Sequence, residues 1–260
     1  MNDSILSGTK RARITAITSG KGGVGKTFVS ANLAAALAKR GERVLVLDAD
    51  LGLANLDVVL NLYPKITLHD VFTGKHRLED AIVPVAGGFS VLLAGSGMVE
   101  YSRLSPEVRD QLLETIERVT PMFDRVLLDT GAGISDVVLY TLSLAHDILV
   151  VTTPEPTAMT DAYATIKVLA ATQSRRVLLL AVNQVLKPGE GRTIRGQLQL
   201  VVDKFVSPGL PEPVNLEFVG ELPSDPAVRE AVQKRQLLME LYPGSPAAMA
   251  VTALAARVGL

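Results

Sequence analysis

A glycine-rich segment with two lysines, residues 20–27, is the part of this sequence best suited to chemistry. It reads Gly-Lys-Gly-Gly-Val-Gly-Lys-Thr and fits G-x-x-x-x-G-K-[ST], the pattern of a phosphate-binding P-loop. Glycine has no Cβ, so backbone N–H groups can approach phosphate oxygens closely. In this pattern Lys26 reaches the β- and γ-phosphates, and the Thr27 hydroxyl binds Mg²⁺. The expected nucleotide-binding residues are Gly20, Lys21, Gly22, Gly23, Val24, Gly25, Lys26, Thr27 and Phe28.

The residues around this loop supply the strand and the helix that a P-loop requires. Residues 13–18 form a β-branched run that predicts a strand. Val29, Leu33 and Leu37 then recur at helical spacing, and Gly41 follows as a helix stop. A plain glycine-rich turn between a strand and a helix is the alternative interpretation.

Two further apolar runs end in carboxylates. Residues 43–48 end at Asp48, with Asp50 two positions later, and residues 123–129 end at Asp129. Such runs predict parallel strands buried on both faces, and the carboxyl ends of these strands meet at the ligand-binding edge of a sheet. We therefore expect these acids beside the P-loop, with Asp129 directed at Mg²⁺. Solvated turn residues, or a helix N-cap in the case of Asp129, are the alternatives.

The alternation of strand-like and helix-like segments predicts the fold class α/β: a doubly wound, mostly parallel sheet with helices on both faces. We expect a polar N-terminal tail over residues 1–12 and one domain over residues 13–260. The remaining expectations are strands at residues 89–94, 147–152, 176–182 and near 219–225, helices at 68–72, 78–82, 106–119, 161–169 and from 246 onward, and an exposed basic loop at 187–195.

Composition narrows the classes of function. The chain has 260 residues, of which 48% are hydrophobic, a net charge of −1 and no cysteine. The lack of cysteine excludes thiolate zinc sites and cysteine-held iron–sulfur clusters. The near-neutral charge gives no general electrostatic support for nucleic-acid binding. The sequence shows neither a secretory signal nor an apolar run long enough to cross a bilayer, so we expect a cytoplasmic protein.

Lys21 is unusual, because an ordinary P-loop needs no lysine at its second position. With this lysine, residues 20–27 resemble the deviant Walker A motif of the MinD/ParA ATPases. Residues 48–57, Asp-Ala-Asp-Leu-Gly-Leu-Ala-Asn-Leu-Asp, resemble the switch I region of the FlhG/FleN branch of that family, which controls flagellar number and placement. Residues 154–157, Pro-Glu-Pro-Thr, also resemble this branch. A solvated loop lysine is the alternative for Lys21 taken by itself.

The resemblance implies an ATP-dependent homodimer that hydrolyses ATP slowly and requires Mg²⁺. In such a dimer Lys21 reaches the nucleotide of the partner subunit, and Asp50 orients the attacking water. The side-chain amide of Asn183 could pair with adenine, because it has both a donor and an acceptor. A structural role in a turn is the alternative for this residue. The implied site residues are Lys21, Lys26 and Asp50 for catalysis, Thr27, Asp48 and Asp129 for the metal, Asn183, Pro223 and Asp225 for adenine, and Gly131, Ala132 and Gly133 for the switch II loop.

Partners are implied in the same way: an FlhF-type GTPase, flagellar switch proteins or a flagellar transcription activator, with a polar or membrane-peripheral location in the ATP state. Residues 1–10 lack the Asp-Gln-Ala-like motif with which FlhG proteins commonly act on FlhF. The last helix carries one cation, Arg257, so we expect weak membrane binding. One alternative is a ParA- or MinD-type positioning ATPase for a chromosome, cargo or division site, although the net charge disfavours DNA binding. Another alternative is a small-molecule ligase or kinase.

Overall fold

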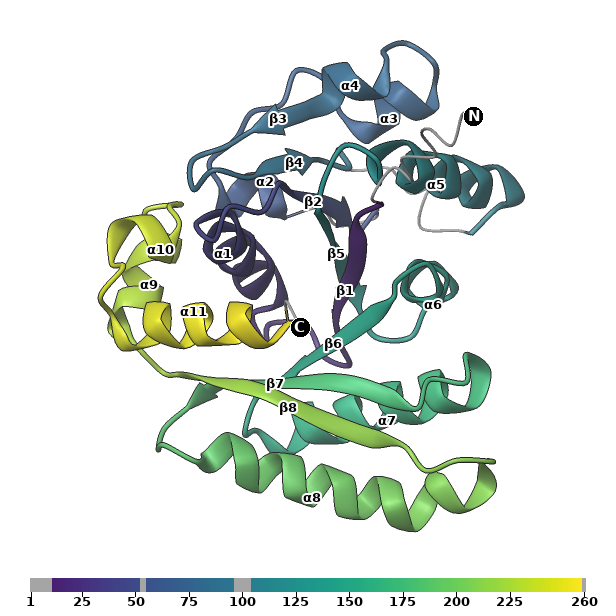
Figure 1. Ribbon diagram of the computed structural model, residues 1–260, viewed down its shortest axis with the longest axis vertical. Helices are drawn as coiled ribbons and strands as arrows, with labels where there is room; N and C mark the ends of the chain where they lie inside the picture. Colours follow the sequence, from purple (N-terminus) through teal and green to yellow (C-terminus); the bar gives the residue numbers. More distant parts are fainter. Residues whose placement is uncertain (1–10, 52–54, 96–103, 259–260) are drawn as a thin grey trace, which may run out of the picture.

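An eight-stranded sheet runs through the protein in the order β3-β4-β2-β5-β1-β6-β7-β8 (Figure 1). The computed structural model describes residues 11–51, 55–95 and 104–258. Neighbouring strands are parallel except β3 and β4, which pair antiparallel. The strands are β1 (Arg13–Ser19), β2 (Val44–Ala49), β3 (Ile82–Pro84), β4 (Ser90–Leu92), β5 (Arg125–Ala132), β6 (Asp147–Thr152), β7 (Val177–Val185) and β8 (Asn215–Pro223).

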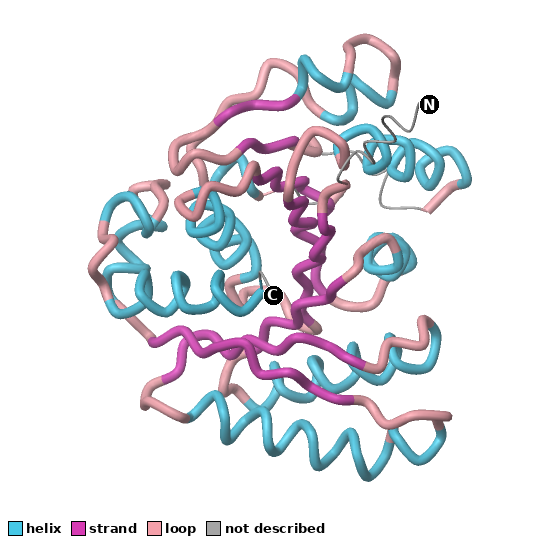
Figure 2. Tube along the Cα trace, in the orientation of Figure 1, coloured by secondary structure: helices cyan, strands magenta, loops and turns pink. Residues whose placement is uncertain are grey.

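Helices cover both faces of this sheet (Figure 2). One face carries α1, α9, α10 and α11, and the other carries α5, α6, α7 and α8. The predicted doubly wound α/β fold is therefore confirmed. None of the described helices is long and apolar enough to span a membrane. The helices are α1 (Lys26–Ala38), α2 (Leu56–Val59), α3 (Leu68–Phe72), α4 (Leu78–Ala81), α5 (Pro106–Val119), α6 (Asp136–Ser143), α7 (Pro156–Thr172), α8 (Glu190–Phe205), α9 (Pro226–Gln233), α10 (Leu238–Leu241) and α11 (Pro246–Val258).

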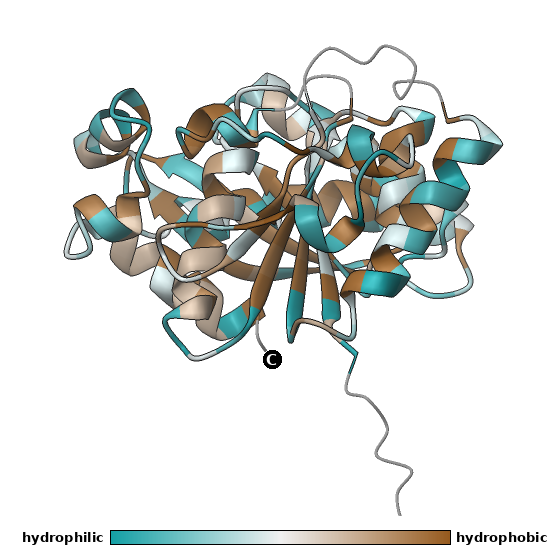
Figure 3. Cartoon of the chain, turned by 90° about the horizontal axis from the view of Figure 1, so that it is seen from above, coloured by the Kyte–Doolittle hydropathy of each residue, from teal (hydrophilic) through white to brown (hydrophobic). Residues whose placement is uncertain are grey.

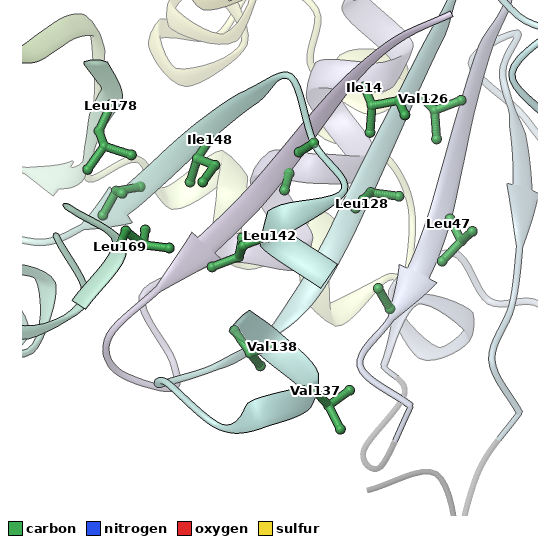
Figure 4. Close-up of a cluster of buried hydrophobic side chains, with 14 of the residues drawn as sticks. Ile14, Leu47, Val126, Leu128, Val137, Val138, Leu142, Ile148, Leu169 and Leu178 are labelled. Atoms are coloured by element: carbon green, nitrogen blue, oxygen red, sulfur yellow. The ribbon is translucent and has the colours of Figure 1, made fainter. Parts of the chain in front are cut away.

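Two buried apolar layers, one on each side of the sheet, hold the helices in place. The central strands are mostly apolar in Figure 3, with hydrophilic residues at their ends, as expected for parallel strands covered on both faces. On β5, Val126 and Leu128 belong to one layer and Leu127 to the other, because side chains alternate along a strand. Figure 4 shows the layer beneath α6 and α7, where Leu142 and Leu169 are fully buried. Each such side chain stabilises the fold by about 1.5–3 kcal/mol.

The segment over residues 187–195 differs from its prediction. The expected exposed loop is wrong beyond Gly189, because α8 begins at Glu190. Ile194, Leu198 and Val202 follow at intervals of four residues and are all buried against the sheet. This apolar stripe outweighs the basic, glycine-containing composition that favoured a loop.

Helix α7 also begins earlier than the predicted residue 161. It starts at Pro156, since proline has no N–H to leave unpaired and its fixed φ suits the first helical position. The early start places the N-terminal end of α7 beside the P-loop. By contrast, α5 has the predicted bounds and the predicted N-cap, as Ser105 Oγ accepts a hydrogen bond of 3.3 Å from the backbone of Val108.

Candidate nucleotide-binding site

The P-loop and the two acidic segments meet at one edge of the sheet, at the C-terminal ends of β1, β2 and β5. Strand β5 lies between the other two and pairs with both. In this register Asp48 on β2 is the direct partner of Asp129 on β5, and Asp129 is also paired with Ile17 on β1. The structure thus brings together carboxylates that are far apart in the sequence and places them next to the P-loop.

Three glycines of the P-loop have conformations or neighbours that exclude a side chain. Gly23 and Gly25 have φ angles of 81° and 92°, in the left-handed region. A Cβ on Gly20 would overlap the backbone carbonyl of Asp161 in α7, and one on Gly25 would overlap the amide nitrogen of Asn183. Among the described residues no side chain caps the start of α1, so its first N–H groups face the loop. This arrangement suits a bound phosphate.

Lys26, the first residue of α1, lies half-buried among carboxylates. Burial lowers the pKa of its ammonium group, while Asp129 and Asp50 favour the charged form. The side chain therefore carries its charge at the start of the helix, where the loop amides also converge. This is the position that the P-loop pattern assigns to a phosphate-binding lysine.

Asp129 is 2% exposed and is held by hydroxyl groups from α1. Ser30 Oγ donates to Asp129 Oδ1 over 2.8 Å. Burial raises the pKa of Asp129 to about 6, against the opposing influence of the Ser30 and Thr27 hydroxyls and of Lys26. The carboxylate and the Thr27 hydroxyl are thus in contact, as two ligands of one metal ion would be.

Asp48 completes the candidate metal site. It is 1% exposed; Oδ1 accepts a hydrogen bond of 3.2 Å from the backbone of Asp50, and Oδ2 is buried without a partner among the described residues. Burial and the neighbouring Asp129 hold the pKa of Asp48 well above its ordinary value. A divalent cation would satisfy both carboxylates. Mg²⁺ is commonly held by one or two carboxylates and takes its other ligands from water and phosphate.

Asp50 and Gly131 bring the two predicted switch segments into contact. A Cβ on Gly131 would lie 3.3 Å from Asp50 Oδ1, so the missing side chain makes room for this carboxylate. Gly131 and Ala132 are the last residues of β5. Gly133 follows with a φ of 88°, and its N–H donates to the carbonyl of Ser19 at 2.8 Å. The end of β5 therefore contacts both the carboxylate of Asp50 and the residue that precedes the P-loop, Ser19.

Lys21 points out of the P-loop toward the start of α7. Its Nζ donates to Glu155 Oε2 at 2.8 Å and to Thr157 Oγ1 at 2.9 Å. The Lys21 and Glu155 side chains are 38% and 63% exposed. A pair this exposed contributes only about 0–1 kcal/mol, so Lys21 can exchange it for another anion. The sequence marked residues 154–157 by resemblance but gave Glu155 and Thr157 no role.

The three predicted adenine residues have structural partners of their own. Asn183 Nδ2 donates to the carbonyl of Val24 at 2.8 Å and so ties β7 to the P-loop. Asp225 is the N-cap of α9, and its Oδ2 accepts a hydrogen bond of 3.1 Å from the backbone of Ala247 at the start of α11. Pro223 is the last residue of β8. These contacts place the three residues near the loop and near α9, and their role toward adenine stays a prediction.

Comparison with known proteins identifies the family. A ParA family model, described as "NUBPL iron-transfer P-loop NTPase", matches residues 10–259. The chain belongs to the ParA family of P-loop NTPases. This ParA-family chain is 42% identical to the antiactivator FleN of Pseudomonas aeruginosa over 246 residues, which cover 95% of this chain and 86% of FleN. It is 34% identical to the flagellum site-determining protein YlxH of Helicobacter pylori, over 89% of this chain and 76% of that protein.

A solved structure of the same family supports the fold and the ligand set. MinD of Pyrococcus horikoshii, complexed with Mg-ADP, matches with a TM-score of 0.73 at 29% identity, over 95% of this chain and 96% of that chain. The predicted membership of the MinD/ParA family and of its FlhG/FleN branch is confirmed. The iron transfer in the description of the family model cannot rely on thiolates here, because this ParA-family chain has no cysteine.

Three polar residues of this ParA-family site escaped the sequence-based prediction: Ser30, Glu155 and Thr157. Ser30 stands three positions after Thr27 and so shares its face of α1, which was a readable signal. Glu155 and Thr157 follow β6, the strand next to β1 in the sheet, but they are more than 130 residues from Lys21 in the sequence, and no local pattern shows that contact.

Proposed function

We propose that this ParA-family chain is an ATP-dependent switch of the FlhG/FleN type that controls flagellar number and placement. The likeness to FleN and to the flagellum site-determining protein YlxH supports the flagellar assignment. The observation that carries the switch mechanism is the position of Lys21. Its ammonium group lies outside its own P-loop, on the exposed contacts with Glu155 and Thr157, and is available to a second subunit.

Nucleotide binding would use groups that already converge. The N–H groups of the P-loop and of the first turn of α1 would hold the phosphates together with Lys26. Thr27, Asp48 and Asp129 would hold Mg²⁺, which neutralises charge on the β- and γ-phosphates when bound. Because Asn183 is bonded to the P-loop carbonyl of Val24, contact with the base at Asn183 would also fix the loop.

Hydrolysis would transfer the γ-phosphoryl group of ATP to water and yield ADP and phosphate. Asp50 would orient the attacking water, and its contact with the end of β5 keeps the carboxylate in place. Lys21 of the partner subunit would neutralise charge that develops on the transferred group, as an arginine finger does. Two subunits would therefore associate with ATP between them and separate after hydrolysis, which suits a slow switch.

Such a switch acts by binding different partner proteins in its ATP-bound and ATP-free states. The antiactivator FleN suggests a flagellar transcription activator as one partner, and the branch as a whole suggests an FlhF-type GTPase or flagellar switch proteins. A cytoplasmic location, with placement at a pole in the ATP state, follows from this proposal. Salt-dependent retention of the ATP-bound protein on DNA would instead favour a ParA-type positioning ATPase.

The test is a flagellar count after deletion of the gene and complementation. Deletion should change the number of flagella per cell, and the wild-type gene should restore it. A gene encoding Lys21→Ala should fail to restore it, whereas Lys75→Ala, which alters an exposed lysine away from the nucleotide site, should succeed. An unchanged flagellar number in the deletion strain would contradict the flagellar assignment.

A further inference from the structure

A groove with apolar walls lies between α2, the turn that joins β3 to β4, and the connection from α9 to α10. Its volume is about 420 Å³. Leucines from two segments line it: Leu60 and Leu62 after α2, and Leu237 and Leu241 at the two ends of α10. The mechanism proposed above uses none of these side chains.

Arg235 is one of the residues that line this groove, and its backbone conformation is unfavourable. Helix α9 ends at Gln233 with Lys234 as its C-cap, and Arg235 follows with a φ of 52°. The N–H of Arg235 donates to the carbonyl of Val232 at 3.1 Å, and the N–H of Gln236 donates to that of Ala231 at 3.0 Å, which is the Schellman pattern. Glycine is the usual residue at this position, because a Cβ in the left-handed region is strained. The local fold would therefore be more stable with glycine than with arginine.

Among the described residues, no contact of the Arg235 side chain offsets this backbone strain. This side chain is exposed, and no hydrogen bond or ion pair joins its guanidinium to another residue that the structure describes. The nearby charges are already matched: Lys234 pairs with Glu230 at 2.7 Å, and Lys39 pairs with Glu240 at 3.3 Å. Arg235 is thus the cation in this groove that still lacks an acidic partner among the described residues. Strain combined with an unused charge points to a role in binding.

A second cavity of about 300 Å³ adjoins the first and shares Asn61, Leu62 and Arg235 with it. This inner cavity contains the carboxylates of Asp48 and Asp57. The outer groove is lined by one acidic residue, Glu240, which is already paired with Lys39, so an acidic ligand would be repelled less there than beside Asp48 and Asp57. The charges therefore fix where along the groove an acidic group would lie.

We propose that the outer groove binds a short apolar segment of a partner protein, and that an acidic side chain of this segment pairs with Arg235. Apolar walls favour burial of apolar side chains, and a guanidinium holds a carboxylate through two parallel hydrogen bonds. Nucleic acid fits poorly, since a polyanion needs several free cations rather than one. A membrane surface fits poorly too, because it requires protruding rather than recessed apolar side chains.

The experiment selects peptides on the intact protein from a display library of random twelve-residue sequences. The enriched sequences should combine apolar residues with an aspartate or a glutamate, and synthetic copies should bind in fluorescence anisotropy. Arg235→Gly should weaken their binding by about 10- to 100-fold, the effect of losing a charge-assisted hydrogen bond. The same substitution should raise the unfolding temperature by about 2–4 °C, because it removes the strain. A loss of binding together with a gain of stability cannot be explained by misfolding.

Two further variants serve as controls. Ser174, which follows α7 on the other face of the sheet, also has a positive φ, of 53°. Ser174→Gly should therefore raise stability and leave peptide binding unchanged. Ala86→Trp places a bulky ring at an exposed groove position and should abolish binding. Failure to enrich any peptide, or equal binding to Arg235→Gly, would overturn the proposal. If Arg235→Gly instead weakened self-association in light scattering and left peptide binding intact, the groove would be an interface between copies of this chain and the proposal would be wrong.

Discussion

Replacing Ser30 with alanine should change the ionisation of Asp129 while leaving the P-loop in place. The Ser30 hydroxyl lies 2.8 Å from Asp129 Oδ1 and 3.0 Å from the carbonyl of Lys26. It has one proton to donate, and the carboxylate is the closer and the stronger acceptor. Alanine fits the same buried space and keeps the helix, but it leaves the carboxylate with one donor fewer.

The size of the effect follows from the hydrogen bond. A bond to a charged group contributes about 1.5–3 kcal/mol, and about 1.4 kcal/mol corresponds to one pKa unit. The Thr27 hydroxyl and Lys26 remain in the variant, so we expect the lower end of this range. The pKa of Asp129, about 6 in the wild-type protein, should therefore rise by roughly one unit in Ser30→Ala.

The sign of the pH dependence is set by this raised pKa. Mg²⁺ requires the ionised carboxylate, so Mg²⁺ affinity in the wild-type protein should rise with pH through about 6. In the folded protein the pKa of Asp129 lies above its ordinary value of 3.8. Protonated Asp129 thus stabilises the metal-free fold below that ordinary value, and this contribution is lost as the pH rises through about 6. In Ser30→Ala both changes should move to higher pH.

The assay is a Mg²⁺ titration of nucleotide binding by calorimetry at a series of pH values. The midpoint of the pH dependence should be about one unit higher in Ser30→Ala than in the wild-type protein. Ser143→Ala removes a helical serine hydroxyl that donates to the backbone carbonyl of Tyr140, and it should leave the midpoint unchanged. Identical midpoints in Ser30→Ala and the wild-type protein would refute the role assigned to this hydrogen bond.

Three further substitutions test the site. Lys26→Ala should abolish nucleotide binding, because the triphosphate loses its principal side-chain cation in the loop, and near wild-type affinity by calorimetry would disprove the P-loop assignment. Asp50→Ala should bind ATP but nearly stop phosphate release and so trap a dimer; unchanged turnover would move the water-orienting role to another residue, with Asp48 the next candidate. Gly20→Ala should destabilise the loop, since its Cβ would overlap the backbone of Asp161, and a wild-type unfolding temperature would contradict this packing.

The sequence contained the information for the sheet and for the edge at which the carboxylates meet. Parallel strands end at a common edge, so Asp48 and Asp129 could be expected to lie together, and they are direct register partners. The period of the apolar residues would also have shown α8, since Ile194, Leu198 and Val202 repeat every four residues. The basic composition of residues 187–195 concealed that pattern.

Contacts between separate elements could not be read in this way. Two contacts of this kind are the bond from Asn183 to the P-loop and the pair formed by Lys21 and Glu155. They depend on the order of β1, β6 and β7 in the sheet and on the placement of α7. No periodicity or motif encodes these distances, because they result from the packing of the whole sheet. The strain at Arg235 is hidden for the same reason, since arginine is an ordinary residue near the end of a helix until its φ of 52° is known.

The central claim is that Lys21 acts on the nucleotide of a second subunit. The most direct measurement is the molecular mass of Lys21→Ala by light scattering with ATP and Mg²⁺, measured beside Asp50→Ala, together with the hydrolysis rate. We predict that Asp50→Ala is dimeric and that Lys21→Ala binds ATP but remains monomeric. Its turnover should fall by about 10³-fold, as when an arginine finger is removed. If Lys21→Ala forms the same dimer as Asp50→Ala and hydrolyses ATP at the wild-type rate, the lysine is an ordinary loop residue and the proposed switch mechanism is wrong.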